Sequence, residues 1–256
     1  MTDVAAPRKR RRWLGVLIAL VVLAALAVAA WFVGDRIARD YAVDLIHDQL
    51  VVAFPSSDPQ VTVAPGSVLA MAIAGSLDAV SVDMGTTEFG DISGSLKFDA
   101  TGVPIDSTKP IENLDITFDI AEADVQRIIT DLDGLENAEL SLADNEVALA
   151  SSFEVFGASI PLGISFAPSV ADSAIVLTPA TVSVNGAVLN LTDLASGPFG
   201  SVVTGIVKPQ TVCVAQYLPA VLTLTDATVT GDRLRLGISG DGIALERSDF
   251  TALGTC

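Results

Sequence analysis

Few side chains of this sequence have the types and the spacing that catalysis requires. His47 is the only histidine, and it lies between Asp44 and Asp48 in a stretch with helical spacing. A serine or cysteine nucleophile needs a base within hydrogen-bond reach, and nothing in the sequence places a nucleophile beside His47. We therefore interpret His47 as a solvated helix residue and predict neither catalytic residues nor an enzymatic activity.

The sequence also lacks the usual patterns for metal and phosphate binding. The segment from Asp131 to Glu136 (DLDGLE) holds acidic residues close together but lacks the ligand spacing of a calcium loop, so it is predicted to be a turn that ends a helix. Two cysteines cannot complete a zinc site, and no P-loop or GxGxxG sequence occurs. We expect no metal and no cofactor.

A long segment without charge runs from Trp13 to Val33 (WLGVLIALVVLAALAVAAWFV). At about 1.5 Å per helical residue it spans the roughly 30 Å of hydrocarbon in a bilayer. Tryptophans mark its two ends, and the basic run from Arg8 to Arg12 predicts a cytoplasmic N-terminus. The sequence thus predicts a basic cytoplasmic segment (residues 1–12), a single transmembrane signal anchor (13–33) and an extracytoplasmic domain (34–256) in the cell envelope.

A cleaved signal peptide is the main alternative to an anchor. The sequence Ala27-Val28-Ala29 has the small residues of a cleavage site, after which the mature chain would begin at Ala30. The apolar run continues beyond it to Val33, which favours the anchor. A buried helix of a soluble protein is a third alternative, disfavoured by the flanking arginines.

The two cysteines, Cys213 and Cys256, both fall in the predicted outer part of the chain. An even number of cysteines outside the cytoplasm usually means disulfide bonding, and two cysteines allow one intramolecular pairing. Closing that loop would stabilise the fold by roughly 4 kcal/mol in the chain-entropy model. We predict a structural disulfide between them.

The composition is both apolar and acidic, with 50% hydrophobic residues and a formal net charge of -17. From Gly34 onward there are nine basic and 30 acidic residues, so the predicted outer domain carries a net charge of -21. This balance argues against nucleic acid as a ligand, because phosphate backbones require clustered lysine and arginine. The apolar share is large enough for a folded core, which argues against disorder.

Beyond residue 61 the main pattern is an alternation of apolar and polar residues, which is typical of strands with one wet face. The predicted strands lie at residues 80–84, 92–98, 114–120, 140–142, 153–155, 160–166, 175–184, 222–229 and 234–238. Asn185-Gly186 is the clearest hairpin turn between them. Helical spacing predicts helices over 35–52, 122–132 and 199–206, and 67–74 is a possible further helix.

These elements predict an α+β fold, in which a few helices pack on the apolar face of one long antiparallel sheet. The wet face of that sheet accounts for much of the acidic charge, since it receives Asp83, Asp99, Asp115 and Asp119.

The order of the elements adds a resemblance to a known family. It is carried by a membrane-proximal helix, the Val61–Val63 strand, a short apolar helix ending at Ala74-Gly75, and the closing segment from Cys213 to Pro219 (CVAQYLP) with a final hairpin around Gly231-Asp232. Together these features resemble the actinobacterial LmeA-like envelope proteins, phospholipid-binding proteins linked to lipomannan elongation. The resemblance covers most of residues 36–250 and implies half of a tubular lipid-binding fold, a long curved sheet wrapped on helices around an apolar groove.

With that fold, periodicity selects the side chains that would face the groove. They are Leu69, Ile73, Ile116, Phe118, Ile128, Ile129, Phe166, Val203 and Ile206. The resemblance implies that the protein binds phospholipid or another acylated molecule there and supports envelope lipoglycan synthesis. The alternative is a structural or interaction domain with a filled core, which positions an envelope glycosyltransferase and holds no ligand.

Overall fold

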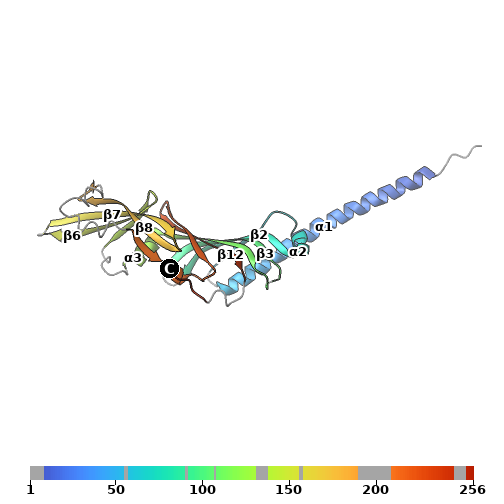
Figure 1. The fold of residues 1–256 in the computed structure, drawn as a ribbon. Helices are drawn as coiled ribbons and strands as arrows, with labels where there is room; N and C mark the ends of the chain where they lie inside the picture. The colour runs from blue at the N-terminus through green and yellow to red at the C-terminus, as the bar shows by residue number, and fades with distance from the viewer. Residues whose placement is uncertain are drawn as a thin grey trace, which may run out of the picture.

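The computed structural model describes residues 9–54, 57–89, 92–106, 108–130, 138–155, 158–189, 209–244 and 252–256. Its first element, α1 (Lys9–Ala53), is a continuous helix that contains both the predicted span and the predicted helix over residues 35–52. Alanine and leucine, which are strong helix formers, dominate its first half. Figure 1 shows that this half projects from one end of an elongated body. By length and composition, the part of α1 from Leu20 to Val52 contains a stretch that is apolar enough to cross a membrane.

The first sheet has six strands among the described residues, in the order β1-β2-β3-β4-β12-β11, and all neighbours are antiparallel. Its strands are β1 (Gln60–Val63), β2 (Ser76–Phe89), β3 (Ile92–Pro104), β4 (Ile111–Ala121), β11 (Thr223–Thr230) and β12 (Arg233–Ile243). Its register agrees with the predicted alternation, because Ile116 on β4 lies opposite Phe98 on β3 and Ile238 on β12. One face of the sheet is therefore apolar.

The second sheet has the order β10-β8-β7-β6-β5, with β9 paired to β8. Its strands are β5 (Glu139–Ala143), β6 (Glu146–Val155), β7 (Ala158–Ala171), β8 (Ala174–Val184), β9 (Ala187–Leu189) and β10 (Gln210–Cys213). Asn185 and Gly186 join β8 to β9, and both have positive φ angles (54° and 78°). This is the backbone that a two-residue hairpin requires, as their sequence predicts.

The short helix α2 (Val68–Ala74) confirms the further helix considered for residues 67–74. The Ser67 side chain caps it by accepting a hydrogen bond from the Ala70 N–H (3.2 Å). Gly75 ends it with a φ of 90°, a conformation that glycine adopts without strain. Figure 1 shows α2 beside α1, at the end of the body from which α1 projects.

Helix α3 (Glu122–Thr130) begins where β4 of the first sheet ends, and it bonds to the outer edge of β5 in the second sheet. The Gln126 amide donates to the Ala138 carbonyl (2.8 Å) and accepts from the Leu140 N–H, and the Glu122 carboxylate accepts from the Leu142 N–H (2.7 Å). Helix side chains thus satisfy backbone groups that an open strand edge would leave unpaired. They also join the two sheets.

The end of the chain is fastened to the body. The predicted disulfide between Cys213 and Cys256 is confirmed. The Gly254 N–H donates to the Leu218 carbonyl (2.9 Å), and the Ala220 N–H donates to the Ala252 carbonyl (2.7 Å). These contacts hold the last residues against the 3-10 turn η1 (Ala215–Tyr217) and the residues that follow it.

The predicted α+β class is confirmed, but the strands divide into two sheets, whereas the sequence predicted one. The chain leaves the first sheet after β4 through α3, builds the second sheet, and returns to the first with β11 and β12. The alternation defines the apolar face of each strand and does not specify which strands pair. The predicted helix over residues 199–206 and the predicted turn over 131–136 lie outside the described residues.

Candidate functional site

Apolar side chains gather between α1, α2 and the first sheet in a group that we call the proximal cluster. Its buried members are Val63, Val68, Met71, Leu77, Val80, Val82, Met84, Leu96 and Ile116. The outer half of α1 covers it with Ala38, Ala42, Val43, Ile46 and Leu50, which repeat at helical spacing. The predicted helix after the span is therefore packed on the domain.

A second group, the distal cluster, lies where α3 and the second sheet meet the first sheet. Its buried members are Ile120, Val125, Leu140, Leu142, Val147 and Val229. Leu149, Leu234 and Leu236 are partly buried against it. These residues come from α3 and from five strands that belong to both sheets. The cluster therefore packs the two sheets together where they meet.

Phe118 on β4 joins the two groups, because its half-buried side chain packs against both clusters. Its ring lies over Gly94 on β3, where a Cβ atom would stand 2.3 Å from the ring carbon Cε2. Only a glycine leaves that space. We call the two clusters together with Phe118 the apolar interior; it runs from α2 to α3 through the contacts of Phe118.

One polar side chain is enclosed at this interior. Thr87 on β2 is only 4% exposed, and it lies opposite Gly94, which in turn lies opposite Ile120 of the distal cluster. Its Oγ1 has no hydrogen-bond partner among the described residues. A buried hydroxyl without a partner costs stability, so a group on a ligand could offset that cost.

The second sheet presents a further apolar face. Phe166 on β7 lies opposite Val147 on β6 and Pro179 on β8, and Ile164 lies opposite Leu149 and Val182. Phe166, Ile164 and Leu149 are only half-buried. Val147 and Leu149 belong to or pack on the distal cluster, so this face continues the apolar interior into the second sheet.

The structure brings some of the predicted groove residues together and separates others. Ile116 is buried in the proximal cluster, Phe118 joins both clusters, and Phe166 lies on the apolar face of the second sheet. Leu69 is half-buried beside Gly34 of α1, and Ile73 is 75% exposed on α2, so neither belongs to a cluster. The side chains of Ile128 and Ile129, and all of Val203 and Ile206, lie outside the described residues.

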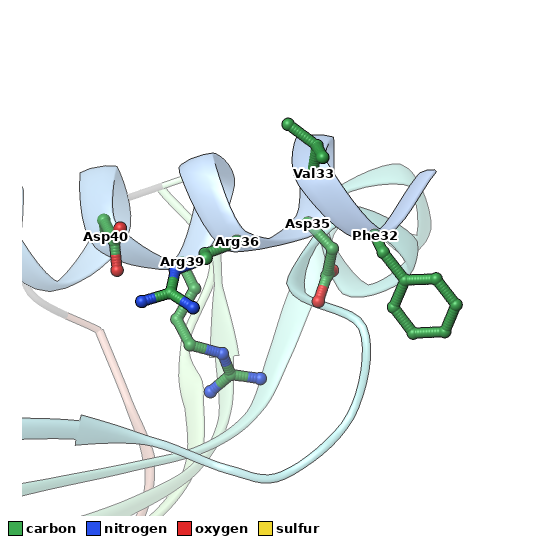
Figure 2. A pocket seen from close by; sticks show the side chains of 6 residues that line it. All are labelled: Phe32, Val33, Asp35, Arg36, Arg39 and Asp40. Atoms are coloured by element: carbon green, nitrogen blue, oxygen red, sulfur yellow. The ribbon is translucent and has the colours of Figure 1, made fainter. Parts of the chain in front are cut away.

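A hollow of about 620 Å³ lies where α1 leaves the body (Figure 2). It is lined by Phe32, Val33, Asp35, Arg36, Arg39 and Asp40. Asp35 accepts hydrogen bonds from the Ser67 hydroxyl (2.7 Å) and the Leu69 N–H (2.9 Å), at the start of α2. Arg39 donates to the carbonyls of Val63, Ala64 and Gly66 at 2.9, 3.2 and 2.6 Å. These contacts attach the first turns of α1 beyond Val33 to β1 and α2.

Charged groups on the outer face of the first sheet pair with one another. The Gly85 N–H and the Lys97 ammonium (3.0 Å) both bond to Asp83, which lowers the pKa of that carboxyl. The Asp119 carboxylate binds the Arg235 guanidinium with two hydrogen bonds, at 2.7 and 3.0 Å, which raises the pKa of the arginine. Both pairs are partly solvated and lie across neighbouring strands, so they act as cross-strand contacts.

Two polar groupings invite a comparison with catalytic sites. The buried Ser165 hydroxyl bonds to the Glu146 carboxylate and the Thr181 hydroxyl, an arrangement that the sequence did not indicate because the three residues come from three strands. The ring nitrogens of His47 on α1 lie 3.7 Å from the Asp48 carboxylate and 3.8 Å from the Asp58 carboxylate. The chain has no other histidine that could serve as a base for Ser165.

The sequence was compared with protein families, curated proteins and solved structures. No curated protein and no solved structure matched it. One family model, described as LmeA-like phospholipid-binding, matches residues 24–239. That match covers most of the chain and includes the outer part of α1, both sheets and the apolar interior. The chain therefore belongs to the LmeA-like phospholipid-binding family.

Proposed function

We propose that this protein is a membrane-anchored, non-enzymatic phospholipid-binding protein of the cell envelope, and that its apolar interior receives acyl chains. The observation that carries the proposal is Phe118, which joins two apolar clusters into one interior that spans both sheets. The family description supports phospholipid as the ligand. The long apolar helix and the basic run from Arg8 to Arg12 support an anchor with its N-terminus in the cytoplasm.

Acyl chains, rather than the headgroup, would supply the affinity. Each buried methylene contributes about 0.8 kcal/mol, so roughly ten carbons would contribute about 8 kcal/mol before the cost of ordering them. The net charge of -21 on residues 34–256 would repel an anionic headgroup. The unpaired Thr87 hydroxyl would donate a hydrogen bond to an ester carbonyl of a bound lipid.

The test compares the phospholipid retained by purified full-length protein and by two variants, using mass spectrometry of extracted lipids. Phe118→Trp fills the interior, and Thr87→Val removes the unpaired hydroxyl while keeping the volume of the side chain. Lipid that surrounds α1 is common to all samples, so the difference between samples reports the interior. We expect wild type to retain more phospholipid than either variant, and the matched control Val188→Trp, on an exposed strand position, to retain as much as wild type.

The same variants distinguish a lipid-binding interior from a filled core. In a filled core Phe118→Trp would overpack and lose roughly 1–3 kcal/mol of stability without any change in bound lipid. Equal lipid in wild type and both variants would contradict the proposal.

The anchor is tested separately by the intact mass of the protein in the membrane fraction, since a mature chain that begins at Ala30 would show a cleaved signal peptide.

A further inference from the structure

The short helix α2 is apolar on all sides, although only one of its sides is buried. Val68 and Met71 point into the proximal cluster. The opposite side carries Ala70, Ile73 and Ala74, which are all exposed, and Ile73 is 75% exposed. A helix on the surface of a soluble domain normally carries polar residues on its outer face, so α2 is unusual for a helix that contacts only water.

A second exposed isoleucine lies next to the end of α2. The Ile105 N–H donates to the carbonyl of Gly75, the residue that caps α2 (3.1 Å), and Ile105 is 56% exposed. Ser76 pairs with Pro104 at the same end of the first sheet, so the loop after β3 and the end of α2 occupy one end of the body. We call Ala70, Ile73, Ala74 and Ile105 the apolar end.

The hydrogen bonds to α1 fix the position of the start of α2 relative to the apolar run. Asp35 holds the N-terminus of α2 through the Leu69 N–H and the Ser67 hydroxyl, and it lies two residues beyond Val33. Two helical residues correspond to about 3 Å along the axis. Arg39, one turn further, binds the carbonyl of the last residue of β1 and two carbonyls on the chain between β1 and α2. The start of α2 is therefore held level with the end of the apolar run.

We infer that the apolar end lies on the outer surface of the bilayer that α1 crosses, with Ile73 and Ile105 inserted among the lipid headgroups. The inference rests on the proposed anchor. It assigns Ile73 to contact with the membrane, in place of the groove position that periodicity predicts. A membrane is the partner that the position favours, because the span continues directly into the helix that holds α2. Apolar side chains at that depth gain free energy by leaving water.

The experiment attaches an environment-sensitive fluorophore to single introduced cysteines in the full-length protein, reconstituted into phosphatidylcholine vesicles. The native cysteines form a disulfide and do not react with the label. The labelled positions are Ile73→Cys and Ile105→Cys, with Val188→Cys as the matched control, since Val188 on β9 is 73% exposed and belongs to the second sheet. Exposed positions of this kind tolerate substitution with little effect on folding.

We expect the label at residues 73 and 105 to emit at shorter wavelength than at 188, and to lose most of its emission when the vesicles contain phosphatidylcholine spin-labelled at the headgroup. Emission at 73 and 105 that matches the control, with no quenching, would overturn the inference. Alkaline extraction of the same vesicles reports the anchor independently. Protein that stays in the membrane but is not quenched at 73 rejects the docking and leaves the anchor intact, whereas protein released by alkali rejects the anchor.

Discussion

At the scale of single residues, the apolar interior depends on a few positions where one side chain limits the size of the residue beside it. Phe118 joins the two clusters only because Gly94 leaves room for its ring on the adjacent strand. Alternation along β4 predicts that Phe118 faces inward, and the structure places it on the apolar face with Ile116. The contact with Gly94 could not be predicted, because it depends on the register between β3 and β4.

Gly94→Ala is expected to destabilise the protein by about 1–3 kcal/mol, since the new methyl group would overlap the Phe118 ring and approach the Asp119 carbonyl at 2.9 Å. Urea denaturation of the full-length protein in detergent measures the change. Phe118→Leu shortens the side chain, so in the double variant Gly94→Ala should cost less than it does alone. Equal costs in both backgrounds would show that the ring is not what excludes the methyl group.

At the scale of elements, local pattern predicted where helices and strands form better than how they associate. The spacing at residues 35–52 and 122–132 predicted helices that the structure confirms as the outer part of α1 and, over residues 122–130, as α3. The uniform apolarity of 67–74 prevented an assignment by periodicity, and the structure shows why: α2 buries one side while its other side is also apolar. The chain passes from the first sheet to the second through α3, and the bonds of α3 to Ala138, Leu140 and Leu142 depend on how the two sheets meet, which alternation along single strands does not specify.

Gln126→Ala is expected to expose the edge of β5, because the Leu140 N–H and the Ala138 carbonyl would both lose their partner. A backbone group that is buried without a partner costs about 1–3 kcal/mol. Hydrogen exchange followed by mass spectrometry should show faster exchange in the peptide that contains Leu140. The matched control is Glu139→Ala, an exposed neighbour on the same strand. Exchange that is unchanged in Gln126→Ala would mean that α3 does not protect this edge.

At the scale of the whole molecule, two features concern the body as a whole: its net charge and the disulfide between Cys213 and Cys256. The charge is divided unevenly along the chain, with a basic run from Arg8 to Arg12 and a net charge of -21 on residues 34–256. The sequence predicted the disulfide from the even number of cysteines, and the structure confirms it. The predicted site is only partly described, since Val203 and Ile206 lie outside the described residues. It remains a prediction that a helix over residues 199–206 covers the interior with these two side chains.

Replacing both Cys213 and Cys256 by serine is expected to lower the free energy of unfolding by up to about 4 kcal/mol, from the loss of a crosslink between residues 43 apart. The loss should fall below that value, because the Gly254 and Ala220 backbone hydrogen bonds remain to hold the last residues. Urea denaturation with and without reductant measures it, and reductant should affect wild type alone. Identical unfolding midpoints for wild type and the double variant would show that the bond contributes nothing to stability.

The continuity of α1 has a consequence for the proposed binding of lipid. From Val33 to Ala53 the helix extends for about 30 Å along the body, with no break between the apolar run and the domain it carries. The proximal cluster lies beside this helix, and the distal cluster lies further from the apolar run. If α1 crosses a membrane as proposed, this rigid attachment would hold the body upright on the bilayer and would give it less reach than a flexible tether. In the proposed anchored protein, lipid that entered at α2 and moved toward α3 would leave the bilayer along its normal, and an acceptor would meet the protein at its far end.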